Sequence, residues 1–192
     1  MMSKFIVFEG IDGSGKSSVG KYLEETFDGL IFTKEPSDSD AGKLAQKAAN
    51  QEHSPYLDLF LYLADRVEHT EKIKRWMSED NDVLCDRYWG STAAYQAAAE
   101  DIDLSYIEYI QETFIHEPDL TILFDVDPEV SIERIEGRDI KSKYEKIDYL
   151  QKVRENYQTL AERHDWVTID ASEPLEDVKD KVYSLVKMEM EK

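Results

Sequence analysis

Five short apolar runs alternate with longer amphipathic stretches along the chain, and this alternation restricts the fold more than any other feature. Most of the runs are apolar at successive positions, which is typical of strands buried on both faces of a parallel sheet. Strands that alternate with helices predict a three-layer α/β fold with a five-stranded parallel sheet between helices. The predicted strands are 4–9, 30–33, 82–86, 120–126 and 166–170, and the predicted helices are 16–28, 38–52, 55–79, 91–117 with a break near 101, 128–137, 144–164 and 174–190.

The composition indicates one domain without a targeting or membrane segment. The 192 residues contain no repeat, no low-complexity segment and no linker rich in Pro, Gly or Ser, so a single domain over 1–192 is the simplest interpretation. No apolar run is long enough to span a membrane, and the N-terminal stretch turns to charge and glycine too early for a signal peptide. We therefore expect a cytoplasmic protein with no membrane partner.

The charge balance argues against binding to a nucleic-acid backbone. The chain carries 23 basic and 42 acidic residues, a formal net charge of -19, whereas nucleic-acid-binding proteins present a basic face. A phosphate site in this chain must therefore create its own positive potential, which makes clustered arginines informative. Cys85, the only cysteine, reads as a small core residue, and the four histidines show no metal spacing and are expected at the surface.

The first predicted strand runs directly into "GIDGSGKSS", which fits the phosphate-binding P-loop pattern G-x-x-x-x-G-K-[ST]. The glycines let backbone N–H groups surround a phosphate, Lys16 reaches the β- and γ-phosphates, and the Ser17 hydroxyl can bind Mg²⁺. A dinucleotide-binding fold is a weaker alternative, because its third glycine position is Ser18 here. The absence of N-K-x-D argues against a switch GTPase. The predicted phosphate-binding loop is Gly10, Ile11, Asp12, Gly13, Ser14, Gly15, Lys16, Ser17 and Ser18.

Further polar segments follow the other predicted strands, and together they make the chain resemble a known family. The segments "FEGIDGSGKSS", "TKEP", "YLADR", "DRYWGSTAAYQ", "PDLTILFDVDPEVSIERI" and "YEKIDYLQKVRENY" occur in the order seen in thymidylate kinases, over nearly the whole chain. The resemblance implies phosphorylation of dTMP to dTDP with ATP and Mg²⁺, as a step towards dTTP. It also implies a sheet of strand order 2-3-1-4-5, a lid over about 138–145 and a homodimer.

The resemblance also implies an acceptor site. Arg87 would hold the phosphate of dTMP, for which the planar guanidinium is better suited than lysine. Arg66 would read the edge of thymine, Tyr62 would stack on the base, and Tyr95 would lie against the 2′ carbon of the sugar. The dTMP-binding residues implied in this way are Asp12, Glu35, Pro36, Tyr62, Arg66, Arg87, Ser91, Tyr95 and Gln96.

On the donor side, the resemblance implies that Asp86 and Ser17 hold Mg²⁺, while Arg134 and the backbone around Ala171 and Ser172 border adenine. Some family members carry an arginine in the P-loop, but this chain has Gly13 there, so the lid must supply the further cation. We favour Arg138, assisted by Lys141, with Lys143 as another candidate. The catalytic residues implied are Lys16, Arg87, Arg138 and Lys141.

Several alternatives stay open at the level of sequence. Taken alone, Tyr62 fits a core or dimer-interface residue, Arg66 and Glu68 fit a solvated helix pair, and Asp86 with Arg87 fits a structural ion pair. A broader nucleoside monophosphate kinase and a catalytically silent nucleotide-binding protein are the competing functions. The chain departs from the family at Lys34, where arginine is usual, and at 37–40, where glycines are usual, and no role is assigned to these residues.

Overall fold

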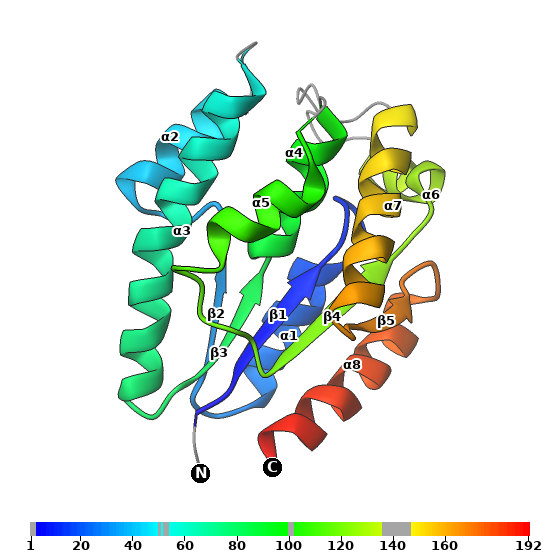
Figure 1. Cartoon of the computed structure of the whole chain (residues 1–192). Helices are drawn as coiled ribbons and strands as arrows, with labels where there is room; N and C mark the ends of the chain where they lie inside the picture. Colours follow the sequence, from blue (N-terminus) through cyan, green and yellow to red (C-terminus); the bar gives the residue numbers. More distant parts are fainter. Residues whose placement is uncertain (1–2, 50, 52–53, 100–101, 136–146) are drawn as a thin grey trace.

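The computed structural model describes residues 3–49, 51, 54–99, 102–135 and 147–192, and these contain a single five-stranded parallel sheet (Figure 1). The strand order is β2-β3-β1-β4-β5. The predicted α/β class and strand order are therefore confirmed. The strands are β1 Phe5–Glu9, β2 Leu30–Lys34, β3 Asp82–Asp86, β4 Leu120–Asp125 and β5 Val167–Asp170.

Helices cover both faces of the sheet, as right-handed crossovers require. The chain moves from β1 outward to β2, then back to β3 and on to β4, so the first crossover helix lies on the opposite face from the later ones. Helix α1 packs beside α8, whereas α3, α4 and α7 lie together on the other face (Figure 1). The helices are α1 Lys16–Thr26, α2 Asp40–Ala48, α3 Pro55–Ser78, α4 Trp89–Ala99, α5 Leu104–Gln111, α6 Pro128–Ile135, α7 Ile147–Arg163 and α8 Leu175–Met190.

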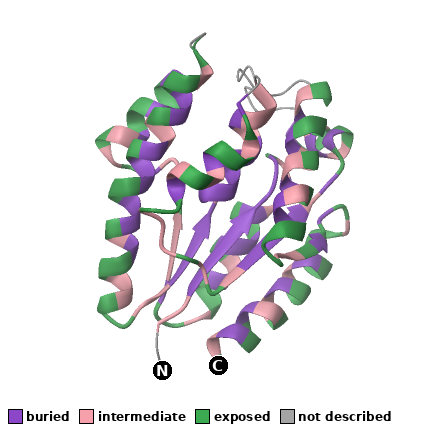
Figure 2. Cartoon of the chain, viewed as in Figure 1, coloured by how far each residue is buried: buried purple, intermediate pink, exposed green. Residues whose placement is uncertain are grey.

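The central strands form the core because both of their faces are covered. All five residues of β1 are buried, and the sheet runs as a buried band between helices whose outer faces are exposed (Figure 2). The edge strands β2 and β5 are only partly buried. This explains why the central strands read as continuous apolar runs, and why the apolar pattern of β5 is weaker.

The carboxyl ends of β1 and β3 lie side by side and position the functional residues. Phe8 is in register with Asp86, and the backbone N–H of Arg87 donates to Phe8 O at 2.8 Å. The Glu35 N–H donates to Asp86 O at 3.1 Å, which ties the residue after β2 to the same edge. The crossovers leave β1 and β3 in opposite directions, and the crevice at such a switch point is where open α/β sheets bind ligands.

The differences from the predicted elements are local. The stretch predicted over 91–117 with a break near 101 is two helices, α4 and α5, as that break implies, but α5 ends at Gln111. The helix predicted over 38–52 ends at Ala48. The predicted lid at 138–145 lies outside the described residues. Among the helices that are described, none is long and apolar enough to cross a membrane.

Candidate active site

The loop between β1 and α1 has the backbone shape that the P-loop pattern predicts. Gly10 has φ 141°, and a Cβ atom there would lie 2.6 Å from Phe124 O. Gly13 has φ 75°, and its Cβ would lie 2.6 Å from Ser131 O. Only glycine fits both the dihedral angle and the space at these two positions. The loop then leads into the N-terminus of α1 at Lys16, an end that favours anions.

Lys16 lies folded under this loop. Its Nζ donates to Gly10 O at 2.8 Å, Ile11 O at 2.9 Å and Ser14 Oγ at 3.1 Å. Burial, followed by the nearby Arg87 guanidinium, lowers the pKa of Lys16 to about 8. The Lys16 ammonium therefore loses its proton more easily than that of an ordinary lysine. An anionic phosphate beside it would raise the pKa again and stabilise the charged form.

A cavity of about 830 Å³ opens above the loop and extends to the region after β5. The predicted donor residues from Asp12 to Ser18 line it, together with Asp86, Arg134, Ala171 and Ser172. Arg134 donates to Ala171 O at 2.7 Å and to Ser172 O at 3.0 Å, so α6 is joined to the segment after β5. Gly10 and Ile11, the first two residues of the loop, accept from Lys16 through their carbonyls and are not part of the lining.

Ser17 and Asp86 form a pair of oxygen ligands suited to Mg²⁺. The Ser17 hydroxyl donates to Asp86 Oδ2, while Asp86 Oδ1 is buried and has no hydrogen-bond partner among the residues that the structure describes. A hydroxyl and a carboxylate are the hard ligands that Mg²⁺ prefers beside nucleotide phosphates. An unpartnered buried carboxylate oxygen is costly, which gives the site a reason to take up a cation or its water.

A second cavity of about 230 Å³ lies between α3, α4 and the segment after β2. All nine residues of the predicted acceptor set line it, drawn from four segments of the chain far apart in sequence. Thr92 and Ala49, which were not predicted, complete the lining. Asp12 and Arg87 line both this cavity and the larger one, so the two spaces meet at these two residues.

Arg87 stands at this junction, and three hydroxyl groups and one carboxylate fix its guanidinium. Nη1 donates to Ser91 Oγ at 3.1 Å and to Tyr157 Oη at 3.2 Å. Nη2 donates to Asp12 Oδ1 at 2.8 Å and to Tyr95 Oη at 3.1 Å. The positive charge of Arg87 holds the pKa of Asp12 below its usual value. The predicted alternative of an Asp86–Arg87 ion pair is wrong: Arg87 pairs with Asp12, and Asp86 turns to Ser17.

Arg66 forms the other end of the acceptor cavity and is only 1% exposed. Nη1 donates to Thr92 Oγ1 at 2.9 Å and to Gln111 Oε1 at 2.5 Å, while Nη2 forms an ion pair with Glu35. Its Nε is buried and has no partner within the described part of the chain. The alternative of a solvated pair between Arg66 and Glu68 is therefore wrong.

Two further residues support Arg87, and neither was predicted. Glu9, at the end of β1, accepts from the backbone N–H of Tyr88 at 3.0 Å and from the Ser91 hydroxyl at 2.5 Å. Burial raises the pKa of Glu9. Tyr157, on α7, shares a hydrogen bond of 2.7 Å with the same Ser91 hydroxyl. The Tyr157 hydroxyl also donates to Glu9 Oε2 at 3.3 Å, across 148 residues. Both residues lie in segments that carry the family resemblance, which was the signal that could have found them.

One prediction about the histidines is wrong. His69, on α3, was expected at the surface, but it is 1% exposed and hydrogen-bonded through both ring nitrogens. Its position gave no sign of burial, because the buried residues of α3 mix polar and apolar side chains, with Asp65, Arg66 and Thr70 beside Leu63 and Ile73.

Comparison with known proteins assigns the chain to a family. The family model described as thymidylate kinase matches residues 8–182. The chain belongs to the thymidylate kinase family. Relatives named "probable thymidylate kinase" include one from Methanosarcina mazei, 39% identical over 97% of this chain and 96% of the relative. Others are from Pyrobaculum aerophilum, 39% identical over 95% and 96%, and from Pyrococcus horikoshii, 39% identical over 99% and 98%.

The segment where this chain departs from the usual thymidylate kinase pattern is anchored by Asp65. The Asp65 carboxylate accepts from Ser37 N at 2.7 Å, Ser37 Oγ at 2.5 Å and Ser39 Oγ at 2.8 Å. Ser39 in turn caps α2 by accepting from Gly42 N at 2.8 Å. The serines that replace the usual glycines thus hold residues 35–39, named here the acceptor loop, against α3.

Proposed function

We propose that this chain transfers the γ-phosphoryl group of ATP to dTMP, with the donor in the 830 Å³ cavity and the acceptor in the 230 Å³ cavity. Membership of the thymidylate kinase family makes the chain a phosphotransferase that acts on dTMP. The observation that carries the two-site assignment is the junction at Asp12 and Arg87, which border both spaces. A donor and an acceptor must meet end to end for in-line transfer.

The base end of the acceptor cavity favours thymine. Arg66 Nε and Gln96 Nε2 are buried polar atoms without partners among the described residues, and both side chains line the cavity. Two N–H donors match the carbonyl oxygens of thymine, whereas the amino group of cytosine or adenine would leave a donor unpaired. The cavity is also smaller than the roughly 300–1,000 Å³ of typical ligand sites, which favours a single-ring base.

The ring of Tyr62 and the hydroxyl of Tyr95 shape the rest of the acceptor site. Tyr62 is half-buried at the cavity wall, where it can stack on the base, and burial raises its pKa to about 12, so its hydroxyl stays protonated. The Tyr95 hydroxyl accepts from Arg87 at 3.1 Å, and the Arg87 guanidinium carbon lies 4.9 Å from the centre of the Tyr95 ring. We propose that this ring excludes a ribose 2′-hydroxyl.

Catalysis requires positioning and neutralisation of charge, because the acceptor phosphate oxygen is already a nucleophile. Arg87 would hold the acceptor phosphate and Lys16 the β- and γ-phosphates of ATP. Ser17 and Asp86 would hold Mg²⁺, which when bound supplies further positive charge at the phosphates. Arg138 and Lys141, with Lys143 beside them, are the cations proposed for the lid, and all three lie outside the described residues.

We also propose a single kinase domain over 1–192 that forms a homodimer through α3. Tyr56, Leu57, Phe60 and Val67 are each 45–55% exposed on this one helix, and exposed apolar side chains gathered in this way mark interaction surfaces. A second copy would bury the same face of both chains. The cytoplasmic location and the absence of a nucleic-acid partner remain predictions from the sequence.

The proposal is tested with a panel of acceptors. Purified protein with ATP and Mg²⁺ should convert dTMP faster than dUMP, and both far faster than CMP, UMP or AMP. The preference over dUMP should be modest, since one methyl group discriminates by about 10- to 200-fold. Preference for CMP, UMP or AMP would instead indicate a broader nucleoside monophosphate kinase. ATP binding without ADP formation for every acceptor would indicate a catalytically silent protein.

A further inference from the structure

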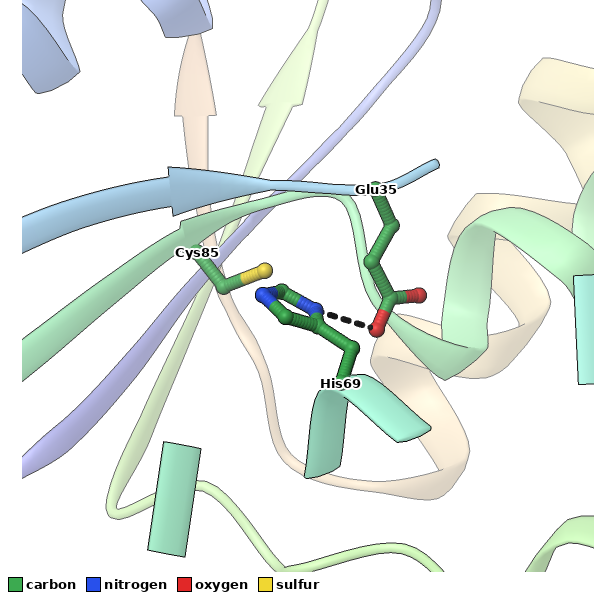
Figure 3. Close-up of side chains that lie close together, drawn as sticks. All are labelled: Glu35, His69 and Cys85. Carbon is green, nitrogen blue, oxygen red and sulfur yellow. Dashed lines mark hydrogen bonds and ion pairs between the residues drawn. The ribbon is translucent and has the colours of Figure 1, made fainter. Parts of the chain in front are cut away.

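Three buried side chains, Glu35, His69 and Cys85, lie close together, and Glu35 also lines the acceptor cavity (Figure 3). Their potential ligand atoms are within 4.8 Å of one another, a spacing that a metal ion could bridge. The chemistry does not favour a metal. Burial raises the pKa of the Cys85 thiol well above its ordinary value, and that thiol donates to Arg87 O at 3.0 Å. A thiol that stays protonated is a poor ligand.

The contacts of Glu35 point to a different role for the cluster. One carboxylate oxygen forms the ion pair with Arg66, and the other lies 2.9 Å from His69 Nδ1. Arg66 and His69 are three residues apart on α3, so they lie on the same side of the helix. Their side chains bind the two oxygens of the Glu35 carboxylate. His69 thus fixes the orientation of the Glu35 carboxylate, and this carboxylate in turn fixes the orientation of the Arg66 guanidinium.

The hydrogen bonds of His69 define its tautomer. A carboxylate can only accept, so Nδ1 carries the hydrogen that faces Glu35. His69 Nε2 lies 2.9 Å from Thr33 Oγ1, and in the neutral imidazole it accepts from that hydroxyl. Thr33 belongs to β2, so the imidazole is tied at one end to the sheet and at the other to the acceptor loop.

We propose that His69 is a positioning residue for recognition of the thymine base. Through Glu35 it holds the Arg66 guanidinium in an orientation that engages Nη1 and Nη2 and leaves Nε as the one guanidinium nitrogen without a partner among the described residues, on a side chain that lines the acceptor cavity. Without the imidazole, Glu35 can rotate and Arg66 can follow it. This inference rests on the proposed role of Arg66 in reading the base.

The role is tested by comparing His69→Leu with His69→Asn. Leucine fills the space but makes neither hydrogen bond, whereas the asparagine amide can still donate to Glu35 from a position close to that of Nδ1. His69→Leu should raise the KM for dTMP by about 10- to 100-fold, the loss expected for a hydrogen bond to a charged group. It should leave the KM for ATP within about twofold, since the donor cavity shares no residue with the cluster. His69→Asn should recover most of the loss.

A second readout separates positioning from mere stability. His69→Leu should also reduce the ratio of kcat/KM for dTMP to that for dCMP, because a misdirected Arg66 discriminates bases less well. Thr33→Val, which removes only the Nε2 contact, should have an intermediate effect and serves as the second variant if His69→Leu does not fold. His164→Leu, at an exposed histidine, is the matched control and should behave as wild type.

Three outcomes overturn the inference: an unchanged KM for dTMP in His69→Leu, equal increases in the KM values for both substrates, or no recovery in His69→Asn. Arg66→Leu tests the underlying assumption separately. If Arg66→Leu leaves the KM and base selectivity unchanged, the base-reading role fails and the inference fails with it. If Arg66→Leu is severely impaired while His69→Leu is not, only the positioning role is wrong.

Discussion

Arg87 offers the sharpest test of the proposed junction between donor and acceptor. Replacing it with alanine removes the only arginine that borders both cavities among the described residues. A hydrogen bond to a charged group contributes about 1.5–3 kcal/mol, so loss of a bidentate contact to phosphate should cost about 3 kcal/mol of transition-state stabilisation. This corresponds to a decrease of about 150-fold in kcat/KM for dTMP.

The backbone at Arg87 makes it possible to separate function from folding. Its φ of 71° lies in the left-handed region, which costs a non-glycine residue roughly 1–2 kcal/mol. Arg87→Gly relieves this strain while removing the same guanidinium. We therefore expect Arg87→Gly to lose as much activity as Arg87→Ala while unfolding at a higher temperature. If the two variants lose the same activity although their stabilities differ, the loss comes from the missing guanidinium and not from unfolding.

The assay is ADP formation measured by a coupled enzyme reaction, with dTMP and ATP varied in turn. Both variants should show a raised KM for dTMP and a lowered kcat, with a much smaller change in the KM for ATP. Arg75→Ala, at an exposed arginine on α3, is the matched control. Should kcat/KM for dTMP in Arg87→Ala stay within about threefold of wild type, the phosphate-binding role assigned to Arg87 would be refuted.

Three further predictions concern the loop lysine, the acceptor loop and the lid. The pKa of Lys16 is lowered to about 8 without nucleotide, so the affinity for ADP should be constant below about pH 8. Above about pH 8 the affinity should fall, because Lys16 must take up a proton when ADP binds. Calorimetry that shows the same ADP affinity from about pH 7 to about pH 9 would contradict this. Asp65→Ala, which frees both serines of the acceptor loop, should raise the KM for dTMP about tenfold, whereas Glu68→Ala, one turn away and exposed, should not. Arg138→Ala should lower kcat with little change in the affinity for dTMP, and an unchanged kcat would move the catalytic cation to another lid residue.

The α/β class could be predicted from the sequence because it depends on local patterns, whereas the strand order came from the resemblance to the family. Apolar runs of strand length and the glycine spacing at 10–15 identify the central strands and the loop without knowledge of any contact. The limits of the elements were less predictable. The stretch predicted as helical over 91–117 with a break near 101 already ends at Gln111, and Asp103 caps its second helix, α5, by accepting from Ser105 N at 2.8 Å. The pattern indicated the break, but the residues at which each helix begins and ends depend on caps and packing.

The candidate site could be predicted only in part, because its residues are joined by contacts that leave no mark in the sequence. The acceptor set came from resemblance, and the structure brings these residues together in one cavity. The ion pair between Asp12 and Arg87 spans 75 residues, and the hydrogen bond between Thr33 and His69 spans 36. Each partner alone reads as an ordinary polar residue. The prediction that His69 is exposed was wrong for this reason.

The Asp12–Arg87 pair also explains how a chain with a net charge of -19 can hold an arginine ready for an anionic substrate. A buried guanidinium without a counter-ion is costly, and Asp12 provides the counter-ion when no substrate is bound. The Asp12 side chain is 57% exposed, so water can solvate it when a phosphate takes its place beside Arg87. Ser91, Tyr95 and Tyr157 each contact the guanidinium directly, and these three hydroxyl contacts keep it in position during that exchange. The acceptor phosphate therefore meets an arginine whose orientation is already fixed, and binding need not order it.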